Sequence, residues 1–510
     1  MSTWTSGYVA DIGYTHGYYN ELNPQRARLA FLNAGLVCPE FGSACELGFG
    51  QGLSTNIHAA ASVCTWSGTD FNPAQASFAQ ELAAASGACA ELFDDSFAEF
   101  ASRDLPEFDY IGLHGIWSWI SDENRAVIVD FIRRKLKVGG VLYVSYNTQP
   151  GWGAFAPMRH LMTEHANVIG SEGRGLVSRI DGAIDFAERL LATNPLYARA
   201  NPQIAERIKK VKEHNRQYLA HEYFNRDWHP MPFSAVKQWL EPAKIQYACS
   251  ANYVDHVDAL NLTPEQQAFL NELPDAMFRQ TVRDFMVNQQ FRKDYWVKGA
   301  RRVNPLQQSE ALMQQRVILI SPREDVQLTV QGAVGEAKLS EGVYNPLLEA
   351  LANHKPQSVQ DLIKTLPGQA NALGTVVQAL MVLTAQGHVH PVQAAEVSAR
   401  AAPSSRKLNQ YLLALAKGSA DLSFLASPVT GGGIPLGRIQ QLFLLSVAQG
   451  NNEPQAWVRD TWALLKSQGQ RLVKAGQTIA TDAENLAELN LMAAAFQTKE
   501  LPVLRALQLI

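Results

Sequence analysis

The sequence predicts an α/β protein whose first part is a parallel, doubly wound sheet. Two observations support this prediction. Short apolar runs alternate with helical stretches at intervals of about 20–30 residues, and the first run ends in a glycine-rich turn. The chain has 510 residues, enough for about three domains of roughly 100–200 residues each.

The expected strands are apolar or β-branched runs bounded by turn residues. In chain order they cover residues 43–47, 64–69, 90–93, 108–114 and 141–145. Helices are expected between them at about 54–63, 73–85 and 123–137, the second beginning after Asn72-Pro73, a typical helix start. The last strands of the sheet are expected at 245–249 and 291–297.

This pattern divides the chain into three regions. Residues 1–303 are predicted to form a Rossmann-like domain with a helical insertion at about 153–225. Residues 304–398 hold strand-like segments at 317–320 and 326–330, three short helical stretches and a final strand, an order that suits a winged-helix-like middle domain. Residues 399–510 are predicted to be a mostly helical C-terminal domain.

Composition and charge exclude several classes of protein. The 46% hydrophobic and 18% charged residues exclude wholesale disorder. Forty-four Lys and Arg against 48 Asp and Glu give no basic footprint for nucleic acid, and residues 367–391 of the middle region contain no Lys or Arg at all. No apolar run reaches the ~20 residues that span a bilayer. We therefore expect neither nucleic-acid binding nor membrane insertion.

The amino terminus lacks the basic and apolar regions of a secretory signal, so a cytoplasmic protein is expected. Five cysteines without a CxxC pair give neither a disulfide framework nor a zinc site. His388 and His390 have no accompanying cysteine or acid cluster, and two outward histidines on a strand explain them better than a metal site. No metal is expected.

The candidate site begins where the first strand ends. Glu46 is followed by Gly48, Gly50 and Gly52, spaced as GxGxG, and such glycines let the backbone turn tightly and approach a ligand closely. Dinucleotide folds usually show GxGxxG and bind pyrophosphate at the helix N-terminus. An acid before the glycines does not suit an anion, but it suits the α-amino group of S-adenosylmethionine (SAM), which carries no phosphate. The pattern therefore favours SAM over NAD.

Acids also follow the next two strands. Asp70 lies 24 residues after Glu46, where a carboxylate can accept both ribose hydroxyls. Asp95, with the small Ser96, follows the third strand, where an acid can accept from the adenine amino group. Phe71, beside Asp70, is included in the predicted cofactor site. Each acid alone suits a helix N-cap equally well, but three acids at successive strand ends indicate one binding site.

The end of the fourth strand would lie beside the sulfonium. His114, Trp117 and Trp119 follow this strand closely. Aromatic rings can stack on adenine or present a π-face to a cation, and plain core packing is the alternative for both tryptophans. His114 is a candidate cofactor contact and general base, with a structural histidine as the alternative.

These residues resemble the class I SAM-dependent methyltransferases, and Leu136–Leu142 looks like the turn before that family's fifth strand. Further segments resemble a bacterial subgroup that carries a methyltransferase regulatory domain and includes rickettsial-type protein lysine methyltransferases: Tyr14–Tyr19, Tyr143–Trp152, Ser427-Pro428 with Gly433–Pro435, Ser467–Gln470 and Glu484–Leu489. The resemblance spans nearly the whole chain, with that regulatory domain expected toward the C-terminus. It implies SAM as cofactor, with Glu46, Gly48, Gly50, Gly52, Asp70 and Asp95 as ligands.

The acceptor side is less determined. The Asn/Asp-Pro-Pro-Tyr/Phe signature of many amino-methylating enzymes is missing after the fourth strand, so their mechanism does not transfer directly. A lysine acceptor must lose a proton before attack, which an aromatic channel with a nearby carboxylate assists. The candidates for this side are Tyr14, Tyr18, Tyr146, Trp152, Glu222 and Tyr223. The predicted catalytic residues are His114, Trp117, Tyr146 and Glu222, and Tyr14 and Tyr18 are also predicted to contact the cofactor.

Three functions remain open at this point. The first is methyl transfer to a protein substrate, at lysine side chains, with the helical insertion and the last two regions binding that substrate. The second is methyl transfer to a small molecule or carbohydrate precursor, and the third is a non-catalytic SAM-binding scaffold. Residues 304–510 carry no reactive constellation, which favours recognition or assembly, including a homodimer through the middle or C-terminal domain.

Overall fold

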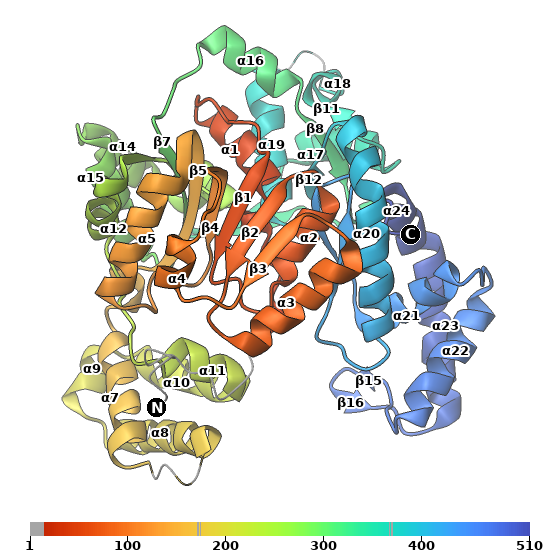
Figure 1. Cartoon of the computed structure of the whole chain (residues 1–510), viewed down its shortest axis with the longest axis horizontal. Helices are drawn as coiled ribbons and strands as arrows, with labels where there is room; N and C mark the ends of the chain where they lie inside the picture. The colour runs from red at the N-terminus through yellow and green to blue at the C-terminus, as the bar shows by residue number, and fades with distance from the viewer. Residues whose placement is uncertain (1–14, 171–172, 174, 367, 369–370) are drawn as a thin grey trace.

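The computed structural model describes residues 15–170, 173, 175–366, 368 and 371–510, and its centre is a seven-stranded sheet (Figure 1). The strand order is β3-β2-β1-β4-β5-β7-β6. Five strands run parallel: β1 (Ser43–Leu47), β2 (Thr65–Thr69), β3 (Ala90–Phe93), β4 (Phe108–Leu113) and β5 (Leu136–Asn147). β7 (Phe291–Lys298) is antiparallel to β5 and to β6 (Ile245–Ser250). The predicted Rossmann-like α/β fold is confirmed.

The largest difference from the predicted elements lies at Leu136–Leu142. Helix α5 (Asp122–Lys135) ends earlier than expected, and β5 begins at once, with Leu136 paired to Phe108 and Val141 paired to Tyr110. Residues 137–140 therefore form a bulge within the strand pairing, rather than a turn before the strand. Gly139 adopts a left-handed φ of +85°, which allows the chain to fold out of the ladder.

Helices cover both faces of the sheet. α1 (Pro24–Asn33), α2 (Leu53–Ala61) and α3 (Pro73–Ser86) lie on one face, and α4 (Phe97–Ser102), α5 and α12 (Phe233–Leu240) lie on the other (Figure 1). Side chains alternate between the faces along each strand: Tyr110 of β4 packs with α1, whereas Ile111 packs with α5. The carboxyl ends of the parallel strands are left for the loops that carry the predicted site.

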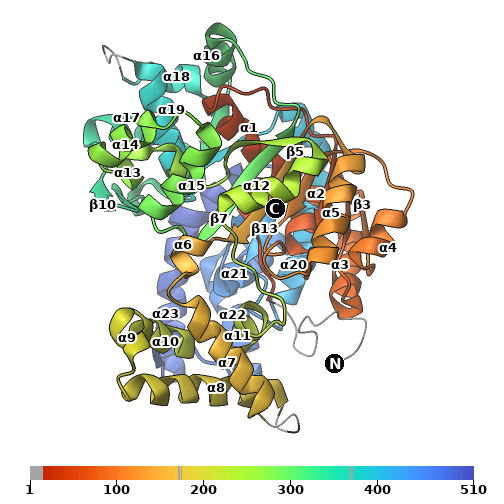
Figure 2. The ribbon, with the colours of Figure 1, turned by 90° about the vertical axis from the view of Figure 1, so that its left-hand side faces the viewer.

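The helical insertion is a separate unit with its own apolar core, attached beside the sheet by α6 (Gln149–Trp152) (Figures 1 and 2). Its helices fall within the expected range of 153–225. They are α7 (Ala156–Val168), α8 (Gly175–Ala192), α9 (Leu196–Ala200), α10 (Ile204–Glu213) and α11 (Arg216–Tyr223). After α12 the chain forms β6, then α13 (Asp258–Asn261), α14 (Pro264–Glu272) and α15 (Ala276–Met286), and then β7.

The middle region contains a three-stranded antiparallel sheet of order β11-β8-β12. Its elements are α16 (Pro305–Met313), β8 (Arg316–Leu319), β9 (Thr329–Gly332), β10 (Gly335–Lys338), α17 (Glu341–Leu351), β11 (Gln357–Ser358), α18 (Val359–Ile363), α19 (Ala372–Ala385) and β12 (Val389–Pro391). The strand expected at 326–330 begins only at Thr329, since a 3-10 turn occupies Arg323–Asp325. This region shares one continuous core with α1 and the large sheet. The winged-helix-like interpretation stays a prediction.

The C-terminal region packs against the outer side of α2 and α3. Its elements are α20 (Ala395–Leu415), β13 (Phe424–Ser427), β14 (Gly432–Pro435), α21 (Arg438–Ala448), α22 (Pro454–Ser467), β15 (Val473–Lys474), β16 (Gln477–Thr478), α23 (Asp482–Ala495) and α24 (Leu501–Ala506). Ser405 Oγ donates to the carbonyl of Ala60, and Gln393 Nε2 donates to that of Ala61. Every residue of α2 is buried, so the helix lies between the sheet and the C-terminal region.

Two predicted absences can be compared with the described residues. Among them, no helix is long and apolar enough to cross a bilayer. No group of three His, Cys, Asp or Glu side chains in this part of the chain is placed to hold a metal ion.

Candidate cofactor and active site

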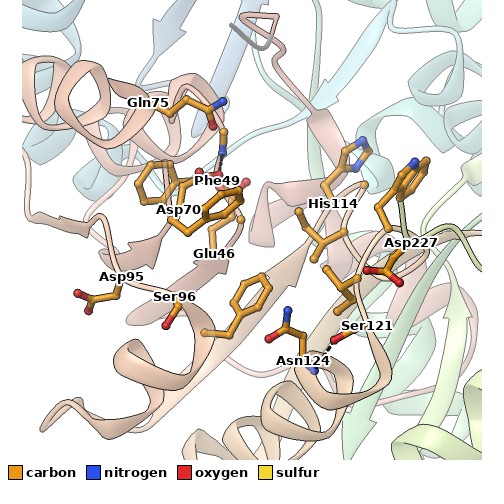
Figure 3. A pocket seen from close by; sticks show the side chains of 18 of the residues that line it. Glu46, Phe49, Asp70, Gln75, Asp95, Ser96, His114, Ser121, Asn124 and Asp227 are labelled. Atoms are coloured by element: carbon orange, nitrogen blue, oxygen red, sulfur yellow. Dashed lines mark hydrogen bonds between the residues drawn. The ribbon is translucent and has the colours of Figure 1, made fainter. Parts of the chain in front are cut away.

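A cavity opens at the carboxyl ends of β1 to β4, with an empty volume of about 1100 Å³ including the part open to solvent (Figure 3). Most of the predicted cofactor residues line it: Glu46, Gly48, Gly50, Asp70, Phe71, Asp95, Ser96 and His114. Asp95 and Ser96 lie at one end, His114 and Asp227 lie at the other, and Glu46 and Asp70 lie between them (Figure 3). The cavity is therefore elongated along the edge of the sheet.

The glycine turn shapes one wall of this cavity. Gly48, Gly50 and Gly52 have φ values of +76°, +58° and +70°, all in the left-handed region. A Cβ on Gly48 would lie 2.3 Å from Ile116 Cδ1, and one on Gly52 would lie 2.4 Å from Ala79 Cβ. Gly52 precedes the first residue of α2 and does not line the cavity, so its contribution is to the turn and to helix packing.

Two carboxyl groups face the centre of the cavity from buried positions. Glu46 is 2% exposed and accepts a hydrogen bond from the Thr55 hydroxyl. Burial raises the pKa of Glu46 to about 8, against the hydrogen bond from Thr55 and with a further contribution from the charge of Asp70. Asp70 accepts from the amides of Gly50 (2.8 Å) and Asn72 (3.1 Å), yet burial still raises its pKa to about 7. A cationic ligand here would lower both pKa values, because it favours the ionised carboxylates.

The third acid, Asp95, differs from Glu46 and Asp70 because its carboxylate already has a cationic partner. Asp95 forms an ion pair with Arg103, including a bond of 3.0 Å from the guanidinium to Oδ1. The N-cap of α4 is Ser96, in a capping box with Glu99, so the capping alternative does not account for Asp95. Both still line the cavity, but the Asp95 carboxylate would have to share its hydrogen bonds with Arg103 to accept from an adenine amino group.

His114 forms the wall at the opposite end. Its Nδ1 lies 2.8 Å from the Tyr143 hydroxyl, and its ring stacks on Tyr19 with 3.7 Å between the centroids. Burial lowers the pKa of His114 to about 3. A group this weakly basic cannot take a proton efficiently from a lysine ammonium, whose ordinary pKa is about 10.4. The geometry therefore favours His114 as a wall and hydrogen-bond partner over the predicted general base.

Several other predicted residues lie outside the cavity. Trp117 is fully buried against Trp239, and the Tyr146 hydroxyl donates to Asp294 (2.7 Å) in a buried network with Arg292. Tyr18 is buried against the C-terminal region, and Tyr14 falls outside the described residues. The backbone is extended at Tyr19, so the two neighbouring side chains point to opposite sides, and Tyr19 reaches the cavity whereas Tyr18 does not.

The cavity also contains residues that sequence reasoning did not select. These are Tyr19, Phe49, Gln75, Phe97, Gly115, Ile116, Ile120, Ser121, Asn124 and Asp227. Trp119, considered beside Trp117, lines the cavity, and its buried indole nitrogen has no hydrogen-bond partner among the described residues. Asp227 follows the helical insertion, far along the chain from the glycine turn, and no local pattern marks it.

Two of the predicted acceptor residues, Glu222 and Tyr223, lie on α11, which also carries Tyr218. The charges of Glu222, Tyr223 and Tyr19 all contribute to raising the pKa of Tyr218, after burial. Burial raises the pKa of Glu222 to about 7. Trp152 lies deeper in the insertion, with the Arg207 guanidinium 4.3 Å from its ring centroid. None of Tyr218, Glu222 and Tyr223 lines the cavity, but the interaction of Tyr218 with Tyr19 shows that α11 lies near the His114 end.

With this geometry in place, comparison with known proteins assigns the family. Uncharacterized protein sll1526 of Synechocystis sp. is 40% identical over 510 residues, covering 99% of both chains. The chain belongs to the same family as sll1526. Uncharacterized protein RP789 of Rickettsia prowazekii is 25% identical over 212 residues, which are 41% of this chain and 36% of that one.

A model described as "Predicted methyltransferase regulatory domain" matches residues 215–298 of this family member. The matched segment runs from α11 to β7, so it supplies the last two strands of the large sheet and the carboxyl of Glu222. The structure of PKMT2 from Rickettsia typhi in complex with AdoHcy is similar over 97% of this chain and 99% of that chain, with a TM-score of 0.66 and 17% identity. This likeness confirms the class I methyltransferase fold. The regulatory-domain match is also as expected in kind, but it lies within the sheet domain and not toward the C-terminus, so its predicted position was wrong.

The raised pKa of Glu46 predicts how stability changes with pH. The ligand-free folded state keeps a proton on Glu46 up to about pH 8, whereas the unfolded chain releases it near its ordinary value, so stability falls as pH rises through this window. Glu46→Gln removes this titration. We expect its melting temperature, measured by calorimetry without ligand, to exceed that of the wild type by a margin that grows from pH 5 to pH 9.

The exposed strand residue Glu91 provides the matched control, since Glu91→Gln removes a carboxylate that is already solvated. Its difference from the wild type should stay small and independent of pH. A margin for Glu46→Gln that is equally flat across this range would contradict the burial argument.

Proposed function

We propose that the protein is a SAM-dependent methyltransferase that methylates lysine side chains of a protein substrate. The observation that carries the proposal is the pair of buried carboxyl groups, Glu46 and Asp70, beside a left-handed glycine turn. SAM presents an ammonium group and ribose hydroxyls, which are hydrogen-bond donors, and no phosphate. Both carboxyls therefore suit SAM and disfavour a dinucleotide, whose pyrophosphate needs N–H donors.

The elongated cavity supports one orientation of this ligand. Glu46 would accept from the α-ammonium group, Asp70 would accept from the ribose, and the Asp95 and Ser96 end would receive the adenine. The His114 and Asp227 end then faces the reacting group (Figure 3), and Tyr218 of α11 interacts with Tyr19, which lines the cavity and stacks on His114. When bound, SAM supplies an electrophilic methyl group. PKMT2 of Rickettsia typhi, which shares the fold, was solved with AdoHcy, the demethylated form of SAM.

The lysine acceptor is supported by the residues near Tyr19. A lysine amine must be neutral to attack, and Glu222, with its pKa raised to about 7 by burial, holds the form that can take a proton near neutral pH. The ring of Tyr19, stacked on His114 at this end of the cavity, also favours the neutral amine by limiting its hydration. Beyond this, the wall residues need only hold the amine in line with the methyl group.

The size of the remaining chain favours a macromolecular acceptor over a small molecule. The helical insertion has its own core, and the middle and C-terminal regions pack against the sheet domain. No described residue of the middle or C-terminal region lines the cofactor cavity. A small-molecule acceptor and a non-catalytic SAM-binding scaffold are the two alternatives to be tested against this proposal.

Methyl transfer from labelled SAM into a lysate of the source cells tests the proposal. We expect label in the macromolecular fraction, resistant to nuclease, sensitive to protease, and recovered as methyllysine after acid hydrolysis. Label confined to small molecules would favour the first alternative. SAM binding without any turnover to S-adenosylhomocysteine (SAH) would favour the scaffold.

The role of Glu222 can be separated from cofactor binding. We expect Glu222→Gln to lower kcat by about 100-fold at pH 7, the usual size of a general-base contribution, while the affinity for SAH stays within twofold. The kcat profile of the wild type should rise with pH through about 7, and the variant should lose that limb.

Glu213→Gln is the matched control, because Glu213 is an exposed residue of α10 in the same helical insertion. It should leave kcat and its pH profile unchanged. An unaltered pH profile in Glu222→Gln would show that Glu222 is not the base.

A further inference from the structure

The segment Thr15–Asn23, called the strap below, connects the cavity with the C-terminal region. It turns tightly at its start, where the Gly17 amide donates to the Thr15 carbonyl, is extended at Tyr19, and then forms a short 3-10 turn, Asn20–Leu22. Tyr19 lines the cavity and stacks on His114, whereas the preceding Tyr18 is buried on the other side of the strap. Neighbouring residues thus face two different parts of the molecule.

Tyr18 inserts into the hairpin formed by β13 and β14. The amide of Gly433 donates to the Tyr18 hydroxyl at 2.6 Å, and the Tyr18 ring lies 4.7 Å from that of Phe424 between centroids. Nε2 of His58, from α2, lies 3.0 Å from the same hydroxyl. The hydroxyl therefore joins the C-terminal hairpin to the helix that begins at the glycine turn.

The glycines of this hairpin leave the space that Tyr18 occupies. A Cβ on Gly432 would lie 2.8 Å from the Tyr18 hydroxyl oxygen, and one on Gly433 would lie 2.8 Å from the ring. Gly431-Gly432-Gly433 suits a plain turn when the sequence is read alone, but its last two residues build the socket for this side chain.

The rest of the strap is fixed to the sheet domain. The amide of Tyr19 donates to Ser54 Oγ in the first turn of α2 (2.9 Å). Glu21 forms an ion pair with Lys293 of β7 (2.7 Å), and Leu22 is fully buried beside Gly112 of β4. Tyr19 is therefore held from both directions, by the sheet domain on one side and by Tyr18 in its socket on the other.

We propose that Tyr18 is a positioning residue through which the C-terminal hairpin sets the place of Tyr19 and hence the affinity of the cavity for SAM and SAH. This inference rests on the proposed function. Coupling of this kind is reciprocal, so a ligand that contacts Tyr19 also stabilises the hairpin on Tyr18. The C-terminal region is then part of the cofactor site, although none of its residues line the cavity.

Hydrogen exchange of the unaltered protein tests the reciprocal effect. Adding saturating SAH should slow amide exchange in residues 424–435, which hold the socket. Residues 473–478, in the exposed β15–β16 hairpin of the same region, should exchange at an unchanged rate. An amide exchange rate in residues 424–435 that does not change when SAH is added would overturn the inference.

Calorimetric titration with SAH tests the role of the side chain. Tyr18→Phe should weaken SAH binding by about five- to tenfold, the effect of one lost buried hydrogen bond, with a normal circular dichroism spectrum. Gly433→Ala, which crowds the socket from the other side, should act in the same direction. Tyr411→Phe is the matched control: its hydroxyl also joins the C-terminal region to the sheet domain, through Glu81, but away from the cavity. That control should bind SAH as the wild type does.

A double substitution separates positioning from general destabilisation. If Tyr18 acts through Tyr19, Tyr18→Phe should weaken binding no further in a Tyr19→Ala background. Fully additive losses would contradict the inference. A wild type that binds no SAH would remove the proposed function and the inference together, whereas equal binding by wild type and Tyr18→Phe would remove the inference alone.

Discussion

A carboxyl group at the end of strand β1, Glu46, loses most of its hydration in this fold, and the neighbouring residues compensate for part of that cost. Glu46 has the Thr55 hydroxyl as its hydrogen-bond donor, and Gly68 on the neighbouring strand leaves room for the Glu46 carbonyl, which a Cβ would approach to 2.8 Å. In the glycine turn that follows, the Gly50 amide donates a hydrogen bond to the Asp70 carboxyl, and this bond holds a second carboxyl beside the first. Two such groups in one buried place need a ligand that donates hydrogen bonds or carries positive charge.

Helix α2 connects the buried carboxyl group of Glu46 with the strap and with the C-terminal region. In its first turn, Ser54 accepts a hydrogen bond from the strap and Thr55 donates one to Glu46. Its last residues, Ala60 and Ala61, accept hydrogen bonds from Ser405 of the C-terminal region and from Gln393, just before that region. The C-terminal region thus supports the helix that forms the cofactor site. The long chain beyond the sheet therefore has a mechanical role at the site, in addition to any role in substrate recognition.

Much of the fold followed from the sequence, since each strand of the large sheet is a short apolar run with a clear end. Glu46 and Asp70 were also predictable, because the carboxyl ends of neighbouring parallel strands meet at one edge. Tyr146 and Trp117 were not correctly placed, because an aromatic residue near a strand end packs into either face with little change in local pattern. Tyr18 and Tyr19 are adjacent in the sequence, and only the tertiary contacts with Gly433 and His114 decide which one reaches the cavity. Asp227 reaches the cavity because the chain returns to the sheet after the helical insertion, and no local sequence pattern predicts this return.

Binding of a ligand that carries an ammonium group should release the protons that the buried carboxyl groups of Glu46 and Asp70 hold in the ligand-free protein. Proton release on SAH binding at pH 7, measured by calorimetry in buffers of different ionisation enthalpy, tests this expectation most directly. Burial keeps the pKa of Glu46 at about 8 and that of Asp70 at about 7 without ligand, and the SAH ammonium group should lower both. We expect the release of on the order of one proton per SAH bound by the wild type, and of roughly half a proton, from Asp70, by Glu46→Gln. Binding with no proton release, or with proton uptake, would contradict this expectation.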